Sequence, residues 1–195
     1  MDKAEKTVKV GLIGLGTVGG GTLEVLAKNS ALIANRAVPI EVSRICNLNV
    51  AYAEQRIAEL GLSNTTATGD YNDLINDPEI DIVIELIGGI HPALEMVTSA
   101  LSAGKSVVTA NKDLIASHGA ELFKLANQEG VDFFFEASVA GGIPVLKALK
   151  DSLAANNILE IMGIVNGTTN YILSQMAAGG ADFQPCLKRA QELGY

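Results

Sequence analysis

A glycine-rich turn between an apolar run and a helical pattern is the feature that most constrains this chain. Residues 8–13 form an apolar, β-branched run typical of a buried parallel strand. The spacing G-x-G-x-x-G follows at Gly14, Gly16 and Gly19. The apolar residues expected on one face of the next helix are Val18, Leu23 and Leu26. This order predicts the first βα unit of a dinucleotide-binding fold.

Each glycine of the turn has a separate expected task. Gly14 should form the tight turn, Gly16 should let a pyrophosphate approach the backbone, and Gly19 should let the helix lie close to the strand. The free N–H groups and the positive end of the helix would then face the phosphates. A glycine-rich turn of an α/β protein that binds no ligand remains the alternative.

Strand and helix patterns alternate six times over residues 1–137, which predicts an α/β fold with a Rossmann-type doubly wound parallel sheet. We expect this NAD(P)-binding domain to end at residue 137. The expected strands are 8–13, 40–47, a short one within 63–79, then 80–87, 106–109 and 131–137. The expected helices after the first are 30–36, 50–60, 93–103 and 117–128.

The end of the second strand bears on the choice of cofactor. An acidic residue there favours NAD and an arginine favours NADP. Here the strand ends in Asn47, Leu48 and Asn49, so neither charge is present. Arg56 on the following helix could reach a 2′-phosphate, or it could be a solvated surface charge. The sequence therefore favours NADP over NAD only slightly.

Two other features lie at the carboxyl ends of expected strands, where ligands bind in an open α/β sheet. Gly88 and Gly89 could bring backbone close to a nicotinamide or ribose, or could form a plain turn. Lys112 follows the strand at 106–109 and could lie in the binding crevice, or could be a surface lysine of a loop.

Residues 138–195 have a different pattern. A glycine-rich loop at 138–144 precedes an expected helix at 144–156 and an expected strand at 158–165. Two further helices are expected at 171–178 and 185–193. One strand and three helices are too few for a core of their own, so we expect the start of an α+β substrate and dimerisation domain that is incomplete.

Composition narrows the class of protein further. A net charge of −8 argues against a general nucleic-acid surface. No apolar run reaches the roughly 18 residues of a membrane span, and the charged N-terminus does not resemble a secretory signal. Two cysteines and two histidines are too few for a metal cluster. The sequence therefore predicts a cytoplasmic protein with no nucleic-acid and no membrane partner.

Four stretches taken together resemble homoserine dehydrogenase, namely GLIGLGTVGGG at 11–21, TANKDLIA at 109–116, FEASVAGGIPVLKAL at 135–149 and MGIVNGTTNYIL at 162–173. The resemblance implies reversible, NAD(P)-dependent interconversion of L-homoserine and L-aspartate 4-semialdehyde, on the route to threonine, methionine and isoleucine. It also implies a homodimer. The positions it assigns to the cofactor are Gly14, Gly16, Thr17, Val18, Gly19, Thr109, Lys112 and Gly194.

The same resemblance assigns a metal site and a reacting centre. Main-chain oxygens of Glu136, Val139, Gly141 and Ile143 match positions that hold a monovalent cation, usually Na⁺, and the alternative for this loop is a hinge. Lys112 matches a lysine beside the nicotinamide and substrate, while the general acid/base is a second lysine expected beyond Tyr195. We therefore expect little or no turnover from these 195 residues.

Two other functions remain open from the sequence. One is a different Rossmann enzyme that acts on an amino-acid-derived substrate. The other is a non-catalytic dinucleotide-binding module. The stretches TANK at 109–112 and NGTTNYIL at 166–173 are not expected in the first group, and a lysine at the end of a strand argues mildly against the second.

Overall fold

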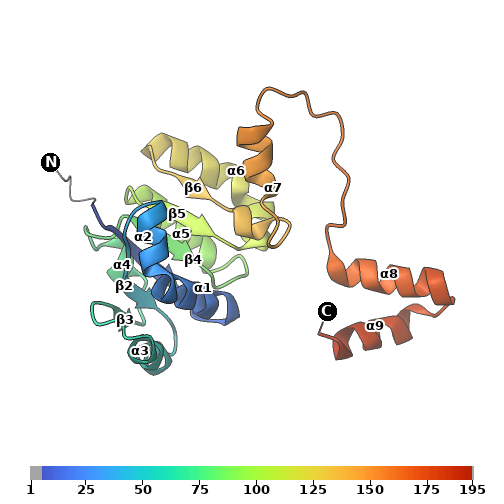
Figure 1. Cartoon of the computed structure of the whole chain (residues 1–195), viewed down its shortest axis with the longest axis horizontal. Helices are drawn as coiled ribbons and strands as arrows, with labels where there is room; N and C mark the ends of the chain where they lie inside the picture. The colour runs from blue at the N-terminus through green and yellow to red at the C-terminus, as the bar shows by residue number, and fades with distance from the viewer. Residues whose placement is uncertain (1–5, 195) are drawn as a thin grey trace. The chain divides into compact units, whose positions relative to one another are not determined.

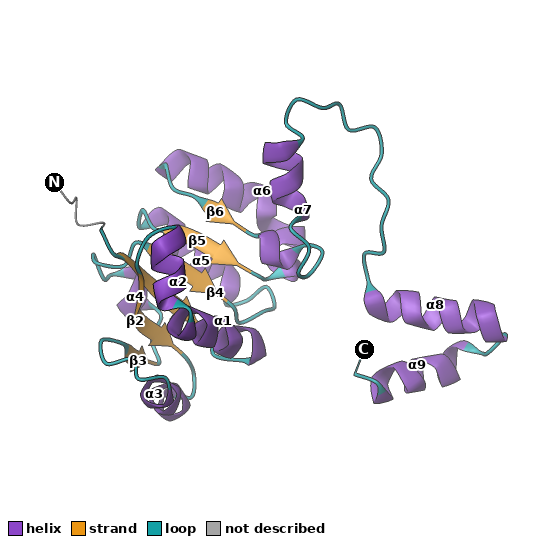
Figure 2. Cartoon of the chain, viewed as in Figure 1, coloured by secondary structure: helices purple, strands orange, loops and turns teal. Residues whose placement is uncertain are grey.

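The computed structural model describes residues 6–194 (Figure 1), and the chain divides into two compact units between Lys147 and Ala148. The first unit contains a six-stranded sheet flanked by helices (Figure 2). Its strands are β1 (Val8–Ile13), β2 (Ile40–Cys46), β3 (Thr66–Thr68), β4 (Ile82–Glu85), β5 (Ser106–Thr109) and β6 (Phe133–Phe134). The domain boundary expected between residues 137 and 138 remains a prediction.

The helices of the first unit alternate with these strands. They are α1 (Thr17–Lys28), α2 (Ser30–Arg36), α3 (Val50–Glu59), α4 (Asn72–Ile75), α5 (Ala93–Ser102), α6 (Lys112–Glu129), the 3-10 helix η1 (Glu136–Ser138) and α7 (Val145–Lys147). The described part of the second unit contains the π-helical turn η2 (Ala148–Ser152), α8 (Gly167–Gly179) and α9 (Phe183–Glu192).

The strand order is β3-β2-β1-β4-β5-β6, and every neighbouring pair is parallel. The chain builds outward from β1 to β3 and then crosses to β4 on the other side of β1. This arrangement confirms the doubly wound, Rossmann-type sheet. It also places a topological switch point between β1 and β4, where open sheets of this kind bind ligands.

Consecutive residues of β1 supply the two cores of the first unit. Leu12 packs in the core that includes Leu23 of α1, whereas Ile13 belongs to the core that includes Val97 of α5 and Leu122 of α6. Successive side chains of a strand point to opposite faces, so one strand serves both layers. Each of these side chains is almost fully buried, and each such burial stabilises the fold by about 2 kcal/mol.

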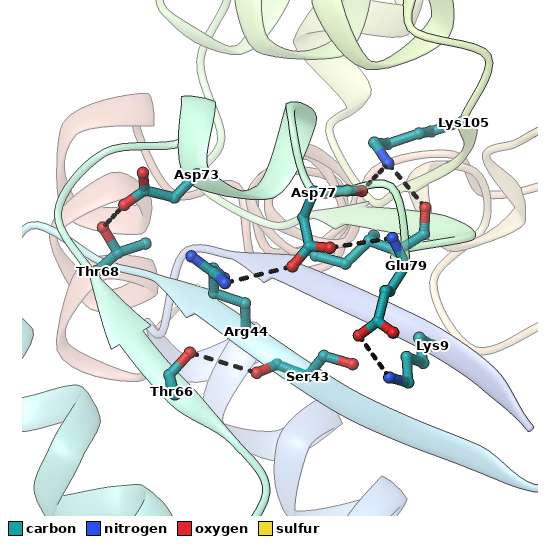
Figure 3. Close-up of polar contacts among 10 residues, drawn as sticks. Lys9, Ser43, Arg44, Thr66, Thr68, Asp73, Asp77, Glu79 and Lys105 are labelled. Atoms are coloured by element: carbon teal, nitrogen blue, oxygen red, sulfur yellow. Dashed lines mark hydrogen bonds and ion pairs between the residues drawn. The ribbon is translucent and has the colours of Figure 1, made fainter.

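Polar contacts fix the turn at the amino end of β4 (Figure 3). The buried Lys105 ammonium donates to the carbonyl oxygens of Asp77 at 2.6 Å and Ile80 at 2.8 Å. The Asp77 carboxylate also pairs with Arg44 of β2 at 3.2 Å. Burial lowers the pKa of Lys105 below 10.5. These contacts lie at the end of the sheet opposite the carboxyl ends of the strands.

Several element boundaries differ from the sequence predictions. The strand expected at 80–87 is confined to Ile82–Glu85, and the one expected at 131–137 shrinks to Phe133–Phe134 because the backbone turns into η1. The helix expected to begin at Ser117 begins at Lys112, because the Asn111 side chain accepts a hydrogen bond from the Leu114 amide and caps it.

One side chain of α1 also differs from expectation. The sequence pattern predicts Val18 on the buried face of this helix with Leu23, but Val18 is 56% exposed, whereas Leu23 is fully buried. Val18 lies in the first turn of α1, and the buried residue of that turn is its neighbour Gly19. The buried face of α1 therefore contains Gly19 and Leu23, and the prediction for Val18 is wrong.

The strand expected at 158–165 is wrong, because these residues form no regular structure. Leu159 and Val165 are 88% and 97% exposed. A strand must pair its backbone N–H and C=O groups with a neighbouring strand, and the described residues contain only the one sheet of the first unit. The helix expected at 144–156 is also shorter, since η2 ends at Ser152.

The two predicted C-terminal helices are present with shifted ends. The Asn166 side chain accepts a hydrogen bond from the Thr169 amide at 2.7 Å, so α8 begins at Gly167. Between residues 6 and 194, no helix is both long enough and apolar enough to cross a membrane.

Candidate functional site

A cleft of about 380 Å³ opens at the carboxyl ends of β1, β2 and β4. Residues 13–16, 46–48 and 86–88 form most of its wall. It therefore lies at the switch point of the sheet, and all three segments belong to the first unit. A larger surface hollow of about 650 Å³ runs along α3 and β3, but its described lining residues lie within 54–67 and include neither the glycine turn nor the carboxyl ends of β1 and β4. The cleft beside β1 is the better candidate site.

The glycine turn at the cleft has the geometry that its spacing predicts. Gly14 has φ +93°, which residues with a side chain rarely adopt, and a Cβ there would lie 2.6 Å from Cγ2 of Ile87. A Cβ on Gly19 would lie 2.0 Å from the carbonyl oxygen of Gly14. Both steric predictions are therefore confirmed. Gly16 has no heavy atom within 4 Å of its virtual Cβ, so space remains beside its backbone.

The start of α1 is suited to an anion. Gly16 is the N-cap residue, and no side chain caps the helix. The first turn, which includes Thr17 and Val18, contains no acidic residue. The N–H groups of a first turn have no acceptor within the helix, and the helix dipole adds positive potential there. This end of α1 therefore fits the pyrophosphate of a dinucleotide.

Asn47 occupies the position at the end of β2 where an acidic residue would contact a ribose. Its Oδ1 accepts a hydrogen bond from the Leu15 amide at 3.1 Å, and its Nδ2 donates to the Asn49 carbonyl at 2.9 Å. Asn47 thus ties the glycine turn to the loop after β2. Arg56 is paired with Glu59 at 2.6 Å and with Glu24 at 3.9 Å, as expected of a surface charge.

The cysteines show no reactive or metal-binding arrangement. Burial raises the pKa of the Cys46 thiol to about 11, and the nearby charges of Asp70 and Asp73 add to the shift. The thiol therefore stays protonated at neutral pH, and both Cys46 and Cys186 are buried and free. Over residues 6–194, no three His, Cys, Asp or Glu side chains come together to hold a metal ion.

The carboxyl ends of β4 and β5 bring a second set of polar residues together. Thr109 is fully buried, donates to the Glu85 carboxylate at 2.6 Å and accepts from the Asn111 amide at 2.9 Å. Lys112 is exposed and begins α6 directly after the Asn111 cap. Sequence reasoning missed Glu85, although a glutamate inside the apolar run IDIVIELI was a signal, since buried acids need partners.

The loop that follows β6 contains the predicted cation ligands. The Glu136 carboxylate accepts from the amides of Leu146 and Lys147, both at 2.9 Å, and so caps α7. The carbonyl oxygens of Glu136 and Ile143 each accept one backbone hydrogen bond. A carbonyl oxygen has two lone pairs, so each could still face a cation. The assignment of a cation to Glu136, Val139, Gly141 and Ile143 remains a prediction.

Gly194 belongs to the second unit. It follows the end of α9 with φ +82°, a conformation suited to glycine after a helix. The structure therefore explains a glycine there through the backbone alone. Its assignment to the cofactor remains a prediction.

The parallel doubly wound sheet, the glycine turn and the cleft at the switch point together define a Rossmann-type dinucleotide-binding protein. Comparison with protein families makes the class more specific. The NAD-binding domain of homoserine dehydrogenase matches residues 14–136, and a second homoserine dehydrogenase domain matches residues 144–195. The chain belongs to the homoserine dehydrogenase family.

Individual relatives agree with this assignment. Homoserine dehydrogenases from Pseudomonas aeruginosa and Synechocystis are 50% and 45% identical, and each alignment covers 97% of this chain. A crystal structure of a homoserine dehydrogenase from Thiobacillus denitrificans has a TM-score of 0.87 and 52% identity over 97% of this chain. A hyperthermophilic archaeal homoserine dehydrogenase in complex with NADPH has a TM-score of 0.77 and 28% identity.

The matched part of these relatives is limited. The chain spans 43% of the Pseudomonas protein, 42% of the Synechocystis protein and 43% of the Thiobacillus structure. The alignment with the archaeal structure covers 97% of this chain and 62% of the archaeal chain.

Proposed function

We propose that this chain binds NAD(P)(H) in the cleft beside β1 and takes part in the interconversion of L-homoserine and L-aspartate 4-semialdehyde. The cleft's position at the switch point, next to an uncapped helix start and open backbone at Gly16, carries the proposal. Family membership supplies the substrate class. This reaction belongs to the biosynthesis of threonine, methionine and isoleucine.

In this proposal, one set of residues in the first unit binds the phosphates of the cofactor, and Lys112 contributes to the reaction. Amides at the start of α1, from Thr17 to Gly19, bind the pyrophosphate, and Gly16 gives it access to the backbone. The bound nicotinamide supplies or accepts the hydride. Lys112, exposed at the carboxyl edge of the sheet, places a positive charge near the substrate oxygen and stabilises negative charge as it develops there.

The position of Lys112 supports a functional role. It is the first residue of α6, where the positive end of the helix dipole makes a cation unfavourable. The same turn carries Asp113, an acidic residue of the kind that stabilises a helix start. A lysine at this place costs stability, which is typical of a residue retained for binding or catalysis.

Both NAD and NADP fit the proposal, with NADP slightly favoured. The end of β2 carries Asn47 in place of an acid that would repel a 2′-phosphate. An archaeal relative in complex with NADPH supports binding of the phosphorylated cofactor. Arg56 would have to leave its glutamate partners to meet a 2′-phosphate, so we assign it no part in binding.

A monovalent cation, a homodimer and a cytoplasmic location complete the proposal. The cation would be Na⁺, held by main-chain oxygens of the loop at 136–143. The positive φ angles of Ala140 and Gly141 turn this loop sharply, which suits carbonyl oxygens converging on an ion. Two buried free thiols suit a reducing compartment.

The proposal is tested first by binding and then by turnover. Titration of this chain with NADPH and NADH, followed by nicotinamide fluorescence, should give saturable binding. Homoserine oxidation should then appear at 340 nm only when the chain is extended by the remaining length found in its relatives. No binding of either dinucleotide would contradict the cofactor site. Turnover near 10 per second by residues 1–195 alone would contradict the need for a second lysine.

A further inference from the structure

A fully buried glutamate lies at the carboxyl end of β4, beside the candidate cleft. One oxygen of the Glu85 carboxylate accepts from the amides of Ile87 at 2.8 Å and Gly88 at 3.3 Å. The other oxygen accepts from the Thr109 hydroxyl of β5 at 2.6 Å. Burying a carboxylate is costly unless hydrogen bonds replace its hydration. Glu85 therefore holds two strand ends together through both of its oxygens.

The hydrogen bonds continue from Thr109 to the start of α6. The Thr109 oxygen accepts from the Asn111 amide at 2.9 Å, and the Asn111 side chain donates to the Gly89 carbonyl at 2.5 Å. The same Asn111 side chain caps α6, which begins at Lys112. These hydrogen bonds, together with the backbone of the 87–89 turn, therefore form a closed ring that joins the turn after β4 to the helix that carries the lysine.

This ring lies at the carboxyl ends of β4 and β5, on the other side of β1 from β2, whose end would meet the adenosine ribose. Ile87 and Gly88 line the cleft together with Gly14 and Gly16 of the glycine turn. Gly88 and Gly89 have φ +74° and +73°, so the turn depends on an unusual backbone conformation that something must hold. The two Glu85 hydrogen bonds to this turn supply that support.

We propose that Glu85 is a positioning residue, whose buried carboxylate holds the 87–89 turn and the start of α6 in the arrangement required by the nicotinamide half of the cofactor. The proposal rests on the proposed function, because it assumes a dinucleotide in the cleft. Glu85 itself is fully buried and acts through the backbone of the turn and through Lys112.

The test separates the two halves of the cofactor. NADPH and 2′-phospho-ADP-ribose share the adenosine and pyrophosphate groups, but only NADPH carries nicotinamide. Binding of each to this chain is measured by calorimetry, with NADH and ADP-ribose run in parallel. In Glu85→Gln and Thr109→Val, NADPH should bind about 10-fold more weakly, while the nicotinamide-free ligand should change by less than about twofold.

Two further variants guard against a merely structural effect. Thr109→Ser keeps the hydroxyl and should retain NADPH binding within about twofold. Lys105→Met removes another buried polar group, at the opposite end of β5, and should lower the melting temperature without changing the ratio of the two affinities. If Glu85→Gln fails to fold, the comparison of Thr109→Val with Thr109→Ser decides the question.

Each other result overturns the proposal in a recognisable way. If Glu85→Gln and Thr109→Val weaken the binding of both ligands equally, the ring has only a general structural role. If neither variant weakens the binding of either ligand, the ring does not serve the nicotinamide half of the cofactor. The same conclusion follows if the unchanged chain binds both ligands with equal affinity. If the unchanged chain binds no dinucleotide at all, the proposed function itself is wrong and this inference is wrong with it.

Discussion

Gly19 and Gly14 approach each other so closely that a Cβ on Gly19 would lie 2.0 Å from the carbonyl oxygen of Gly14. The first turn of α1 can pack against the end of β1 only because residue 19 has no side chain. Gly21, two residues later in the same helix, has open space around its virtual Cβ. Close packing therefore requires glycine at position 19 but not at position 21.

Gly19→Ala should destabilise the first unit and weaken dinucleotide binding. The added methyl group forces the helix start away from the turn, at a cost of about 1–3 kcal/mol. Urea unfolding and NADPH titration measure the two effects. Gly21→Ala is the matched control and should stabilise the chain by about 0.5–1 kcal/mol, because alanine is the better helix former. Equal stability of the two variants would contradict the packing argument.

Lys112→Gln should stabilise the fold slightly while it impairs function. Removing a cation from the first turn of α6 relieves an unfavourable interaction with the helix dipole of about 0.3–1 kcal/mol. Thermal unfolding of this chain should show the gain, and homoserine oxidation by an extended chain should fall. Lys124→Gln, in the interior of the same helix, is the control for loss of charge. Unchanged turnover in Lys112→Gln would remove this residue from the reacting centre.

Asn47→Asp should shift cofactor preference toward NAD. The carboxylate keeps an acceptor for the Leu15 amide, presents oxygens to a ribose 2′-hydroxyl and repels a 2′-phosphate. We expect the ratio of NADPH to NADH dissociation constants to rise about 10-fold. Asn29→Asp adds the same charge at the end of α1, outside the residues that line the cleft, and should leave the ratio unchanged. A similar shift in both variants would point to net charge alone.

Asp81→Asn should reduce the loss of stability in acid. Hydrogen bonds from the Lys6 ammonium at 2.7 Å and the Lys9 amide at 2.9 Å hold the pKa of Asp81 below its usual value of 3.8. The unfolded chain therefore binds this proton first as the pH falls. The stabilisation is present above about pH 4 and is lost as the pH falls through the lower, folded pKa.

Urea unfolding between pH 3 and pH 6 measures this effect. The midpoint for Asp81→Asn should depend less on pH than that for the unchanged chain, and Asp132→Asn, at an exposed aspartate, is the comparison. An unaltered pH dependence in Asp81→Asn would show that its ion pair and amide contact do not persist in solution.

The sequence alone determined the sheet and its glycine turn. Apolar runs and closing glycines are local signals, so the alternation of strands and helices could be predicted together with the steric tasks of Gly14 and Gly19. The motif at 109–116 likewise placed Lys112 after the fifth strand. The motifs also predicted the family, which the comparisons confirm.

Only the tertiary structure decided which polar groups meet. Glu85 and Thr109 are 24 residues apart, and their hydrogen bond depends on β4 lying beside β5 in register. The start of α6 depended on the Asn111 side chain turning back to the Leu114 amide. Residues 158–165 have strand-like composition but no strand beside them in the described chain, so their pattern alone was insufficient. Local sequence fixes propensity, whereas pairing requires a partner that the fold must bring into place.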